Sequence, residues 1–298
     1  MVLILAPAPL NGSRERGMLI EVDLVTHAVP APLHSLVASA HGYAVPANPT
    51  GHHRGLPSRH LTLVIELLAP LVVEGLGATV QAHAVVGGLH TRAAQIDATR
   101  AQEGLQYELT PPAAQALLGV PAGTLQGCVV DLRDVVGSAG DHLDDALHHA
   151  PGWRERFALV DAALLRRLSA ARPGPSTSPE VAEAWRLVFV ADGRVRIGDL
   201  AAHVGWSRRH LGSRFRLATG LTPQEAVRVA RFEAARRQLL RPDRSGLADV
   251  AAACGYADQP HLAREWKRLA GCTIGTWLAE ELPFVQDTST RTAAELSP

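Results

Sequence analysis

The sequence predicts an α+β protein of two parts: an N-terminal, mostly-β, barrel-like domain with accessory helices, and a C-terminal all-α domain of two helix-turn-helix units joined by a long helix. Two observations predict this. Short runs of β-type residues, separated by glycine and proline, fill the first 110 positions, whereas one pattern occurs twice after residue 195. Between them, Ala171–Pro179 is rich in proline and serine, as linkers are. The expected divisions are an N-terminal domain at 1–170, a linker at 171–180, a helical domain at 181–283 and a tail at 284–298.

The first part of the chain is predicted to be mainly strands. Residues 1 to about 30 carry little signal, and Met1–Leu10 lacks the basic start and cleavage site of a signal peptide. A short apolar helix is expected around Leu33–Ala40. The strands expected after it are rich in β-branched and apolar residues, and they are His60–Leu67, Leu71–Val73, Thr79–Val86 and Leu105–Leu109.

Three helices and one more strand are expected between these strands and the linker. Pro111–Leu118 is a helix that Gly119 ends, Cys128–Leu132 is a strand, and Asp141–His149 is a second helix. The third helix, Trp153–Leu168, carries an apolar stripe made of Phe157, Val160, Leu164, Leu165 and Leu168. A stripe of this width serves either as a lid on the barrel or as a dimer contact, and both uses bury it.

The repeated pattern in the C-terminal part is that of a helix-turn-helix. In each copy a short apolar helix ends at a glycine, which can adopt the left-handed conformation that redirects the chain. An aromatic residue follows, and then a residue that can cap a second helix, Ser207 or Asp258. The matching segments are Leu200-Ala201, Gly205-Trp206, Leu211 and Phe215 in the first copy, and Val250-Ala251, Gly255-Tyr256, Leu262 and Trp266 in the second.

A longer helix is expected between the two copies, from Pro223 to Leu240. Thr222 is a suitable cap, and proline is favoured at the first helical position because its missing N–H would be unpaired there. Its apolar stripe consists of Val227, Ala230, Ala234 and Leu239. Such a rigid connector would hold the two second helices of the units at a fixed separation.

Residues 181–283 resemble the DNA-binding domain of the AraC/XylS family of bacterial transcription regulators, which has two helix-turn-helix units joined by a long helix. Besides the repeated segments, the matching residues are Gly220, Thr222-Pro223, Arg231, Ala235, Leu239-Leu240, Asp258, Arg264, Trp266-Lys267-Arg268, Gly271 and Thr273. The sequence departs from the family pattern at Gly212-Ser213, Pro260 and Ile274. The resemblance implies a cytoplasmic, sequence-specific regulator that reads successive major grooves about 34 Å apart.

The charge distribution agrees with a DNA-binding helical domain. The whole chain has 29 basic and 29 acidic residues, so its net charge is zero. Residues 194–278 nevertheless hold 15 arginines and lysines against 7 acidic residues, a net charge of +8. Cationic side chains near a duplex displace condensed counterions, which favours binding at low salt. A basic, solvated helix surface is the alternative that charge alone leaves open.

The residues expected to contact DNA lie on the second helix of each unit. Arg209 is the best candidate for a bidentate contact with guanine, and Arg208 for a phosphate or base contact. By the family pattern, His261 and Arg264 contact bases in the second unit, whereas Lys267 and Arg268 contact phosphates. The full set is Ser207, Arg208, Arg209, Ser213, Arg214, Gln259, His261, Arg264, Lys267 and Arg268. For Arg214 and Arg264, a salt bridge with a neighbouring helix is the structural alternative.

The N-terminal region, from about Pro30 to Leu168, resembles an uncharacterised domain that precedes this type of reader in some relatives. The residues that carry the match include Arg54-Gly55-Leu56-Pro57-Ser58, His60–Val64, Gly87–Thr91 and Thr110-Pro111. In the wider family such a domain commonly senses a small molecule or mediates dimerisation. The expected partners are therefore double-stranded DNA, an effector of unknown identity, a second copy of the chain and RNA polymerase.

The sequence contains none of the catalytic or phosphate-binding motifs considered, and no cofactor is expected. The competing hypothesis is an enzyme or metal-binding β domain with a helical DNA-tethering module. It depends on histidines that lack a fixed metal-site spacing, His52, His53, His60, His83 and His90, and on one predicted helix face with Asp141, Asp145 and His149. Surface or loop histidines and a solvated helix face are the favoured interpretations. The three cysteines are scattered along the chain, so they predict no metal motif. The sequence has no run of 18 apolar residues, so no membrane span is predicted.

Overall fold

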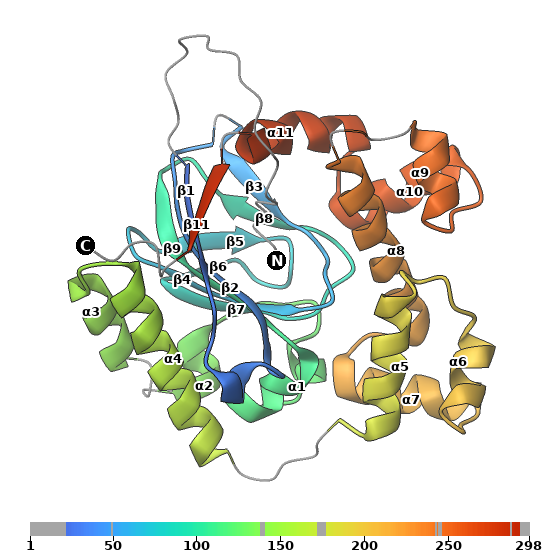
Figure 1. The fold of residues 1–298 in the computed structure, drawn as a ribbon, viewed down its shortest axis with the longest axis horizontal. Helices are drawn as coiled ribbons and strands as arrows, with labels where there is room; N and C mark the ends of the chain where they lie inside the picture. The colour runs from blue at the N-terminus through green and yellow to red at the C-terminus, as the bar shows by residue number, and fades with distance from the viewer. Residues whose placement is uncertain are drawn as a thin grey trace.

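The computed structural model describes residues 22–48, 50–137, 141–171, 177–241, 243, 246–286 and 288–292. The predicted loop and apolar stretch before residue 22 and most of the predicted linker, residues 172–176, lie outside the described residues. The β domain and the helical domain lie side by side in Figure 1: helices α5 to α10 are grouped on one side of the strands, and α11 runs from that group back along the β domain.

Two sheets form the β domain. The seven-stranded sheet has the order β10-β7-β4-β9-β2-β1-β11, and the four-stranded sheet has the order β3-β8-β5-β6. Apolar side chains from both sheets share one core, for example Tyr43 and Val64 from the first and Val73 and Ile96 from the second. The strands are β1 Val22–His27, β2 Val37–Val45, β3 His52–Gly55, β4 Leu61–Glu66, β5 Leu71–Glu74, β6 Val80–Ala82, β7 Ala84–Gly87, β8 Ala94–Asp97, β9 Gln102–Leu109, β10 Val129–Asp131 and β11 Thr288–Thr292.

Most of the predicted strands are present, and two predictions are wrong. The strand predicted at Thr79–Val86 is two strands, because β6 joins the four-stranded sheet and β7 joins the seven-stranded sheet. The helix predicted at Leu33–Ala40 is a single 3₁₀ turn, η1 (Ala31–Leu33), followed by β2. Strand β2 pairs with β1 on one side and β9 on the other, so pairing within the sheet decides its conformation.

Short helices and one long helix cover the seven-stranded sheet. They are α1 (Pro111–Ala113), the π-helical turn η2 (Ala114–Leu118), the 3₁₀ turn η3 (Ala122–Leu125), α2 (Leu132–Val136), α3 (Asp141–His149) and α4 (Trp153–Ala170). Phe157, Val160 and Leu164 of α4 are buried in the same apolar cluster as Leu105 and Tyr107 of β9. The apolar stripe of α4 is therefore the lid of the sheet.

Helix α4 approaches the sheet closely because β2 contains a glycine at the point of contact. A methyl group at Gly42 would lie 2.6 Å from the Trp153 ring, too close for any real side chain. The Trp153 ring is tilted against Phe157, with ring centroids 6.5 Å apart. The sequence thus fixes the start of α4 on the sheet through one missing side chain.

The helical domain has two apolar cores that share one helix. Its helices are α5 (Pro179–Val190), α6 (Ile197–His203), α7 (Arg208–Thr219), α8 (Pro223–Leu239), α9 (Leu247–Ala253), α10 (Gln259–Ala270) and α11 (Ile274–Gln286). Phe215 belongs to the core of the first unit and Trp266 to the core of the second, while α8 contributes Val229 to the first and Phe232 to the second. Figure 1 shows α8 running between the two groups of helices. The predicted connector helix is confirmed.

The end of the chain returns to the β domain. Helix α11 is followed by β11, which pairs in parallel with β1 from Val22↔Thr288 to Thr26↔Thr292. This strand lies within the segment 284–298 that was expected to be a tail. The sequence Thr-Ser-Thr-Arg-Thr has little apolar character to predict a strand.

Candidate nucleic-acid interface

The local chemistry of the two turns is the one that the sequence predicts. Gly205 and Gly255 have φ angles of 73° and 74°, the left-handed conformation that stops α6 and α9. The Ser207 side chain accepts a hydrogen bond from the His210 N–H, and the Asp258 carboxylate accepts one from the His261 N–H. These caps start α7 and α10 at the same place in each unit.

The connector that separates the two units also starts on a side-chain cap. Thr222 Oγ1 accepts a hydrogen bond from the Glu225 N–H, and the Glu225 carboxylate accepts one from the Thr222 N–H. This capping box satisfies two backbone donors that the helix itself leaves unpaired. On α8, Arg228 forms an ion pair with Glu265 of α10, with the Nε and Oε2 atoms 2.7 Å apart.

Helix α7 has one buried face and one cationic face. Leu211 and Phe215 are fully buried in the core of the first unit. The exposed side chains of α7 include Arg208, Arg209, Ser213, Arg214 and Arg216. A methyl group added at Gly212 would have no other atom within 4 Å, so the middle of this face is open.

Helix α10 repeats the arrangement in the second unit. Leu262 and Trp266 are fully buried, as the i and i+4 spacing predicts. Exposed residues on this helix include Gln259, Arg264, Lys267 and Arg268. The two helices therefore each present a row of cations opposite a buried apolar stripe.

His261, which the family pattern assigns to base contact, has local partners. Its Nδ1 atom accepts a hydrogen bond from the Ala257 N–H at 3.2 Å, and its ring meets the Tyr256 ring edge-on with centroids 5.4 Å apart. In the first unit His210 meets Trp206 in the same manner, at 4.6 Å. These pairs were not predicted from the sequence, although it shows a histidine four or five residues after the aromatic residue of each turn.

The arginines of the helical domain fall into two groups. Arg237 of α8 pairs with Asp192, and Arg231 Nε donates to the Gly193 carbonyl, so these two hold the connector against the end of α5. By contrast, six cationic side chains on the exposed faces of α7 and α10 form no ion pair with a residue that the structure describes. They are Arg208, Arg209, Arg214, Arg216, Arg264 and Lys267.

Two arginines of the predicted site, Arg208 and Arg268, lie close to other residues of the helical domain. A methyl group at Gly198 of α6 would lie 2.8 Å from the Arg208 guanidinium, so Arg208 lies back over the start of α6. Arg268 is within 3.8 Å of Glu265, and 63% of its side chain is exposed. Neither Arg214 nor Arg264 forms the salt bridge to a neighbouring helix that was the alternative to DNA contact, within the described residues.

The C-terminal half of α7 faces the β domain. A cavity of about 690 Å³ lies between the two domains beside their contact, and its lining includes Ser213, Arg214 and Arg216 from α7. The opposite wall comes from Pro121–Thr124 around η3. The first part of α7, which includes Arg209, does not line this cavity.

The histidines of the β domain have ordinary partners. His60 lies 3.2 Å from Glu108, and the buried His90 ring donates to the Arg92 carbonyl at 2.6 Å. Burial lowers the pKa of His90 to about 3, which keeps its ring neutral. On the helix face with Asp141, Asp145 and His149, for which a solvated surface is the favoured interpretation, His149 Nδ1 donates to the Asp145 carbonyl. No group of three or more potential metal ligands occurs among the described residues, so the metal-binding alternative gains no support.

No helix among the residues that the structure describes is long and apolar enough to cross a membrane. The three cysteines, Cys128, Cys254 and Cys272, are free thiols.

Comparison with known proteins identifies the helical domain. Residues 200–280 match a family model described as a helix-turn-helix domain. The transcriptional activator NphR of a Rhodococcus species is 36% identical over 89 residues, which are 30% of this chain and 26% of that protein. An AraC-like transcription regulator of Streptomyces antibioticus, described as putative, is 27% identical over 201 residues, 62% of each chain. The chain thus spans less than two thirds of these relatives.

Among solved structures, ToxT from Vibrio cholerae aligns over 81% of this chain and 97% of its own, with a TM-score of 0.49 and 9% identity.

Proposed function

We propose that this chain, whose C-terminal domain belongs to the AraC/XylS family of DNA-binding domains, is a sequence-specific transcription regulator that reads two successive major grooves. The observation that carries the proposal is the pair of equivalent helices, α7 and α10. Opposite a buried face, each presents cations that form no ion pair with any residue that the structure describes. Each helix begins at a side-chain cap after a glycine turn, so both have the same orientation within their unit. Recognition helices of this motif place their first residues against base edges.

Within this proposal the exposed side chains have different roles. Arg209 and Arg264 contact bases, because they are exposed near the start and middle of their helices and have no acidic partner among the described residues. Lys267 and Arg268 contact phosphates and fix the register of the second unit. Ser207, Gln259 and His261 lie at the helix starts, where His261 also braces the turn through Ala257. Arg208, Ser213 and Arg214 complete the surface of the first unit.

The proposal is tested by selecting binding sites from random duplex DNA with the purified protein at two salt concentrations. We expect a motif with two half-elements about one helical turn apart, and a loss of affinity at the higher salt concentration. Salt-sensitive binding without an enriched motif would leave only a non-specific basic surface and would contradict the proposed reading function.

We further propose that the β domain binds a small effector in a cavity beneath α4. The cavity is about 520 Å³, and its walls come from Ile65 of β4, Leu117 of η2 and Leu164 of α4. Arg166 and Arg167 of α4 also line it. Apolar walls with guanidinium groups at one side suit an apolar molecule that carries one anionic group.

An anionic, apolar dye such as anilinonaphthalene sulfonate is the probe for this cavity. We expect a saturable increase in its fluorescence, which Ala163→Phe abolishes because Ala163 lines the cavity. Arg154→Ala, on the same helix but outside the cavity lining, is the matched control and leaves dye binding unchanged. Equal dye binding by the wild type and Ala163→Phe would place the dye elsewhere.

The remaining partners belong to the same proposal. A regulator of this type acts in the cytoplasm and either blocks or recruits RNA polymerase at its operator. A homodimer would have to use a surface other than the buried part of the α4 stripe, because Phe157, Val160 and Leu164 are already packed on the sheet.

A further inference from the structure

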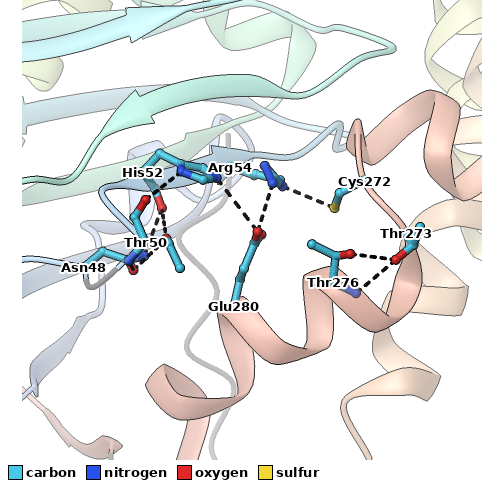
Figure 2. Close-up of polar contacts among 8 residues, drawn as sticks. All are labelled: Asn48, Thr50, His52, Arg54, Cys272, Thr273, Thr276 and Glu280. Carbon is cyan, nitrogen blue, oxygen red and sulfur yellow. Dashed lines mark hydrogen bonds and ion pairs between the residues drawn. The ribbon is translucent and has the colours of Figure 1, made fainter.

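The segment Arg54–Arg59, here called the docking segment, leaves the end of β3 and enters the helical domain. Its first contact is drawn in Figure 2, where the Arg54 guanidinium lies between Glu280 and Cys272. Arg54 Nη2 donates to Glu280 Oε1 at 3.0 Å, and Arg54 Nε donates to Cys272 Sγ at 3.2 Å. His52 approaches the same Glu280 oxygen, at 3.9 Å. The docking segment thereby holds α11 and the turn before it, both parts of the second unit.

Its last residue holds the connector helix α8. The Arg59 N–H donates to Glu233 Oε1 at 2.8 Å, and Arg59 Nε donates to Glu233 Oε2 at 2.7 Å. Glu233 lies in the middle of α8 and is only 5% exposed. A buried carboxylate requires such charge-assisted partners. The Arg59 guanidinium also lies 4.7 Å from the centre of the Phe189 ring of α5, a cation–π contact with the first unit.

Leu56, which lies between the two arginines in the sequence, makes an apolar contact with the helical domain. Leu56 is 3% exposed and belongs to the core of the second unit, together with Phe232 of α8 and Trp266 of α10. A side chain of the β domain thus completes a core of the helical domain. Burial of this leucine removes apolar surface from water and so helps to hold the two domains together.

A second, separate contact holds the first unit. A methyl group at Gly123 in η3 would lie 2.7 Å from the Leu217 carbonyl oxygen, and one at Gly220 would lie 2.2 Å from Gln126 Cβ. Both glycines therefore allow the backbone of η3 to lie directly on the C-terminal end of α7. Leu221, the residue after that end, is fully buried in the apolar cluster of the β domain.

We propose that the docking segment and η3 together act as a clamp that fixes the orientation of α7 relative to α10, so that the β domain determines which spacing of half-elements is read. The two units have separate cores that share α8, and the β domain supplies a second bridge between them. The proposed base-reading residues Arg209 and Arg264 stay exposed, so the clamp leaves these two side chains uncovered. A pre-organised pair of helices loses less conformational freedom on binding. This inference rests on the proposed DNA-reading function.

The test compares affinities for a selected operator, for operators whose half-elements are moved 2 base pairs closer or farther apart, and for one half-element alone. The clamp variant is Arg54→Ala with Arg59→Ala. Its matched control is Arg133→Ala with Arg241→Ala, which removes two ion pairs that each join residues two positions apart, Arg133 with Asp131 and Arg241 with Asp243. For the wild type and the control we expect a loss of about tenfold on the altered spacings, and for the clamp variant a loss of at most about threefold.

Further measurements keep the result interpretable. Arg59→Ala leaves Glu233 buried without its partner, which can prevent folding. Arg54→Ala alone is therefore the second variant, because the partner that it leaves, Glu280, is 17% exposed and can still contact water. Unchanged affinity for the single half-element shows that the variants are folded. Identical spacing profiles for all proteins would overturn the clamp but not the reading function. Tighter binding by the clamp variants to every operator would also overturn it, since the contact would then be inhibitory. If the wild type selects no motif, the proposed function fails, and the clamp with it.

Discussion

At the scale of single residues, the arginines of the helical domain differ in whether a described carboxylate pairs with them. Arg228 and Arg237 pair with carboxylates and hold helices together, whereas Arg209 and Arg264 point to solvent without an acidic partner in the described parts of the chain. An exposed ion pair contributes little to stability, so unpaired exposed arginines are not a structural loss. They are available for an anion, which under the proposed function is a DNA duplex.

Lys267 tests the assignment of phosphate contacts. It is exposed near the end of α10, and we expect Lys267→Ala to weaken binding about equally on all DNA sequences and to lower the slope of log affinity against log salt by about one. Arg133→Ala in the β domain is the control and leaves this slope unchanged. A loss confined to particular base pairs would mean that Lys267 reads a base.

Glu108 supplies a prediction about pH within the β domain. Burial alone would raise its pKa, but hydrogen bonds from His60 and Ser39 outweigh burial and lower the pKa from 4.5 to about 2. Because the pKa is lower in the folded state, these contacts stabilise the fold above about pH 4.5, and their contribution is lost as the pH falls toward about 2.

We therefore expect Glu108→Gln to lower the free energy of unfolding by about 1 to 3 kcal/mol at pH 7 and by clearly less at pH 3. Urea unfolding at both pH values measures this difference. Glu74→Gln, at an exposed position of β5, is the control with little effect at either pH. A difference that is the same at pH 3 and pH 7 would show that the Glu108 charge is not what stabilises the fold.

At the scale of helices and strands, the sequence predicts elements whose signals are local. Gly205, Ser207 and Thr222 specify the turns and helix starts of the helical domain through their own backbone conformation or side-chain hydrogen bonds. The reading helices and their exposed residues could be predicted for the same reason. Whether those residues contact DNA depends on a partner, so it stays a prediction.

Elements that depend on distant pairing could not be predicted in this way. Leu33, Leu36, Val37 and Ala40 are all buried, and their spacing imitates the face of a helix. The register shift between Val37 and Ser39 breaks the alternation that would have indicated β2. Strand β3, His-His-Arg-Gly, has no apolar alternation, and its partner β8 is about 40 residues away. The role of the docking segment depends on contacts between residues that are more than 170 positions apart in the sequence.

The lid helix α4 gives a prediction at this scale. Phe157 is fully buried between α4 and the sheet, where its ring stacks on His27 with centroids 4.2 Å apart. We expect Phe157→Ala to reduce the free energy of unfolding by about 3 to 5 kcal/mol and to leave the oligomeric state unchanged. Leu159→Ala, at a half-buried position beside the stripe, is the control and costs less. Dissociation of an oligomer without loss of stability, in sedimentation and urea unfolding, would instead assign α4 to a dimer contact.

At the scale of the whole molecule, charge distinguishes the two domains and several contacts connect them. The basic charge lies in the helical domain, while the rest of the chain carries the balancing acidic charge. The β domain is joined to that helical domain by the clamp and by strand β11 as well as by the linker region. The proposed effector cavity is lined by η2, and η3, which follows η2 in the chain, meets the end of α7 at Gly123 and Gly220.

The central claim is that α7 and α10 read separate half-elements, and the most direct measurement is to repeat the selection from random duplex DNA with Arg209→Ala and with Arg264→Ala. We predict that each variant loses preference at one position, at a cost of about 1 to 3 kcal/mol, and that the two positions lie in different half-elements about one helical turn apart. Loss of preference at the same position in both variants, or equally weakened binding to all sequences, would contradict the claim.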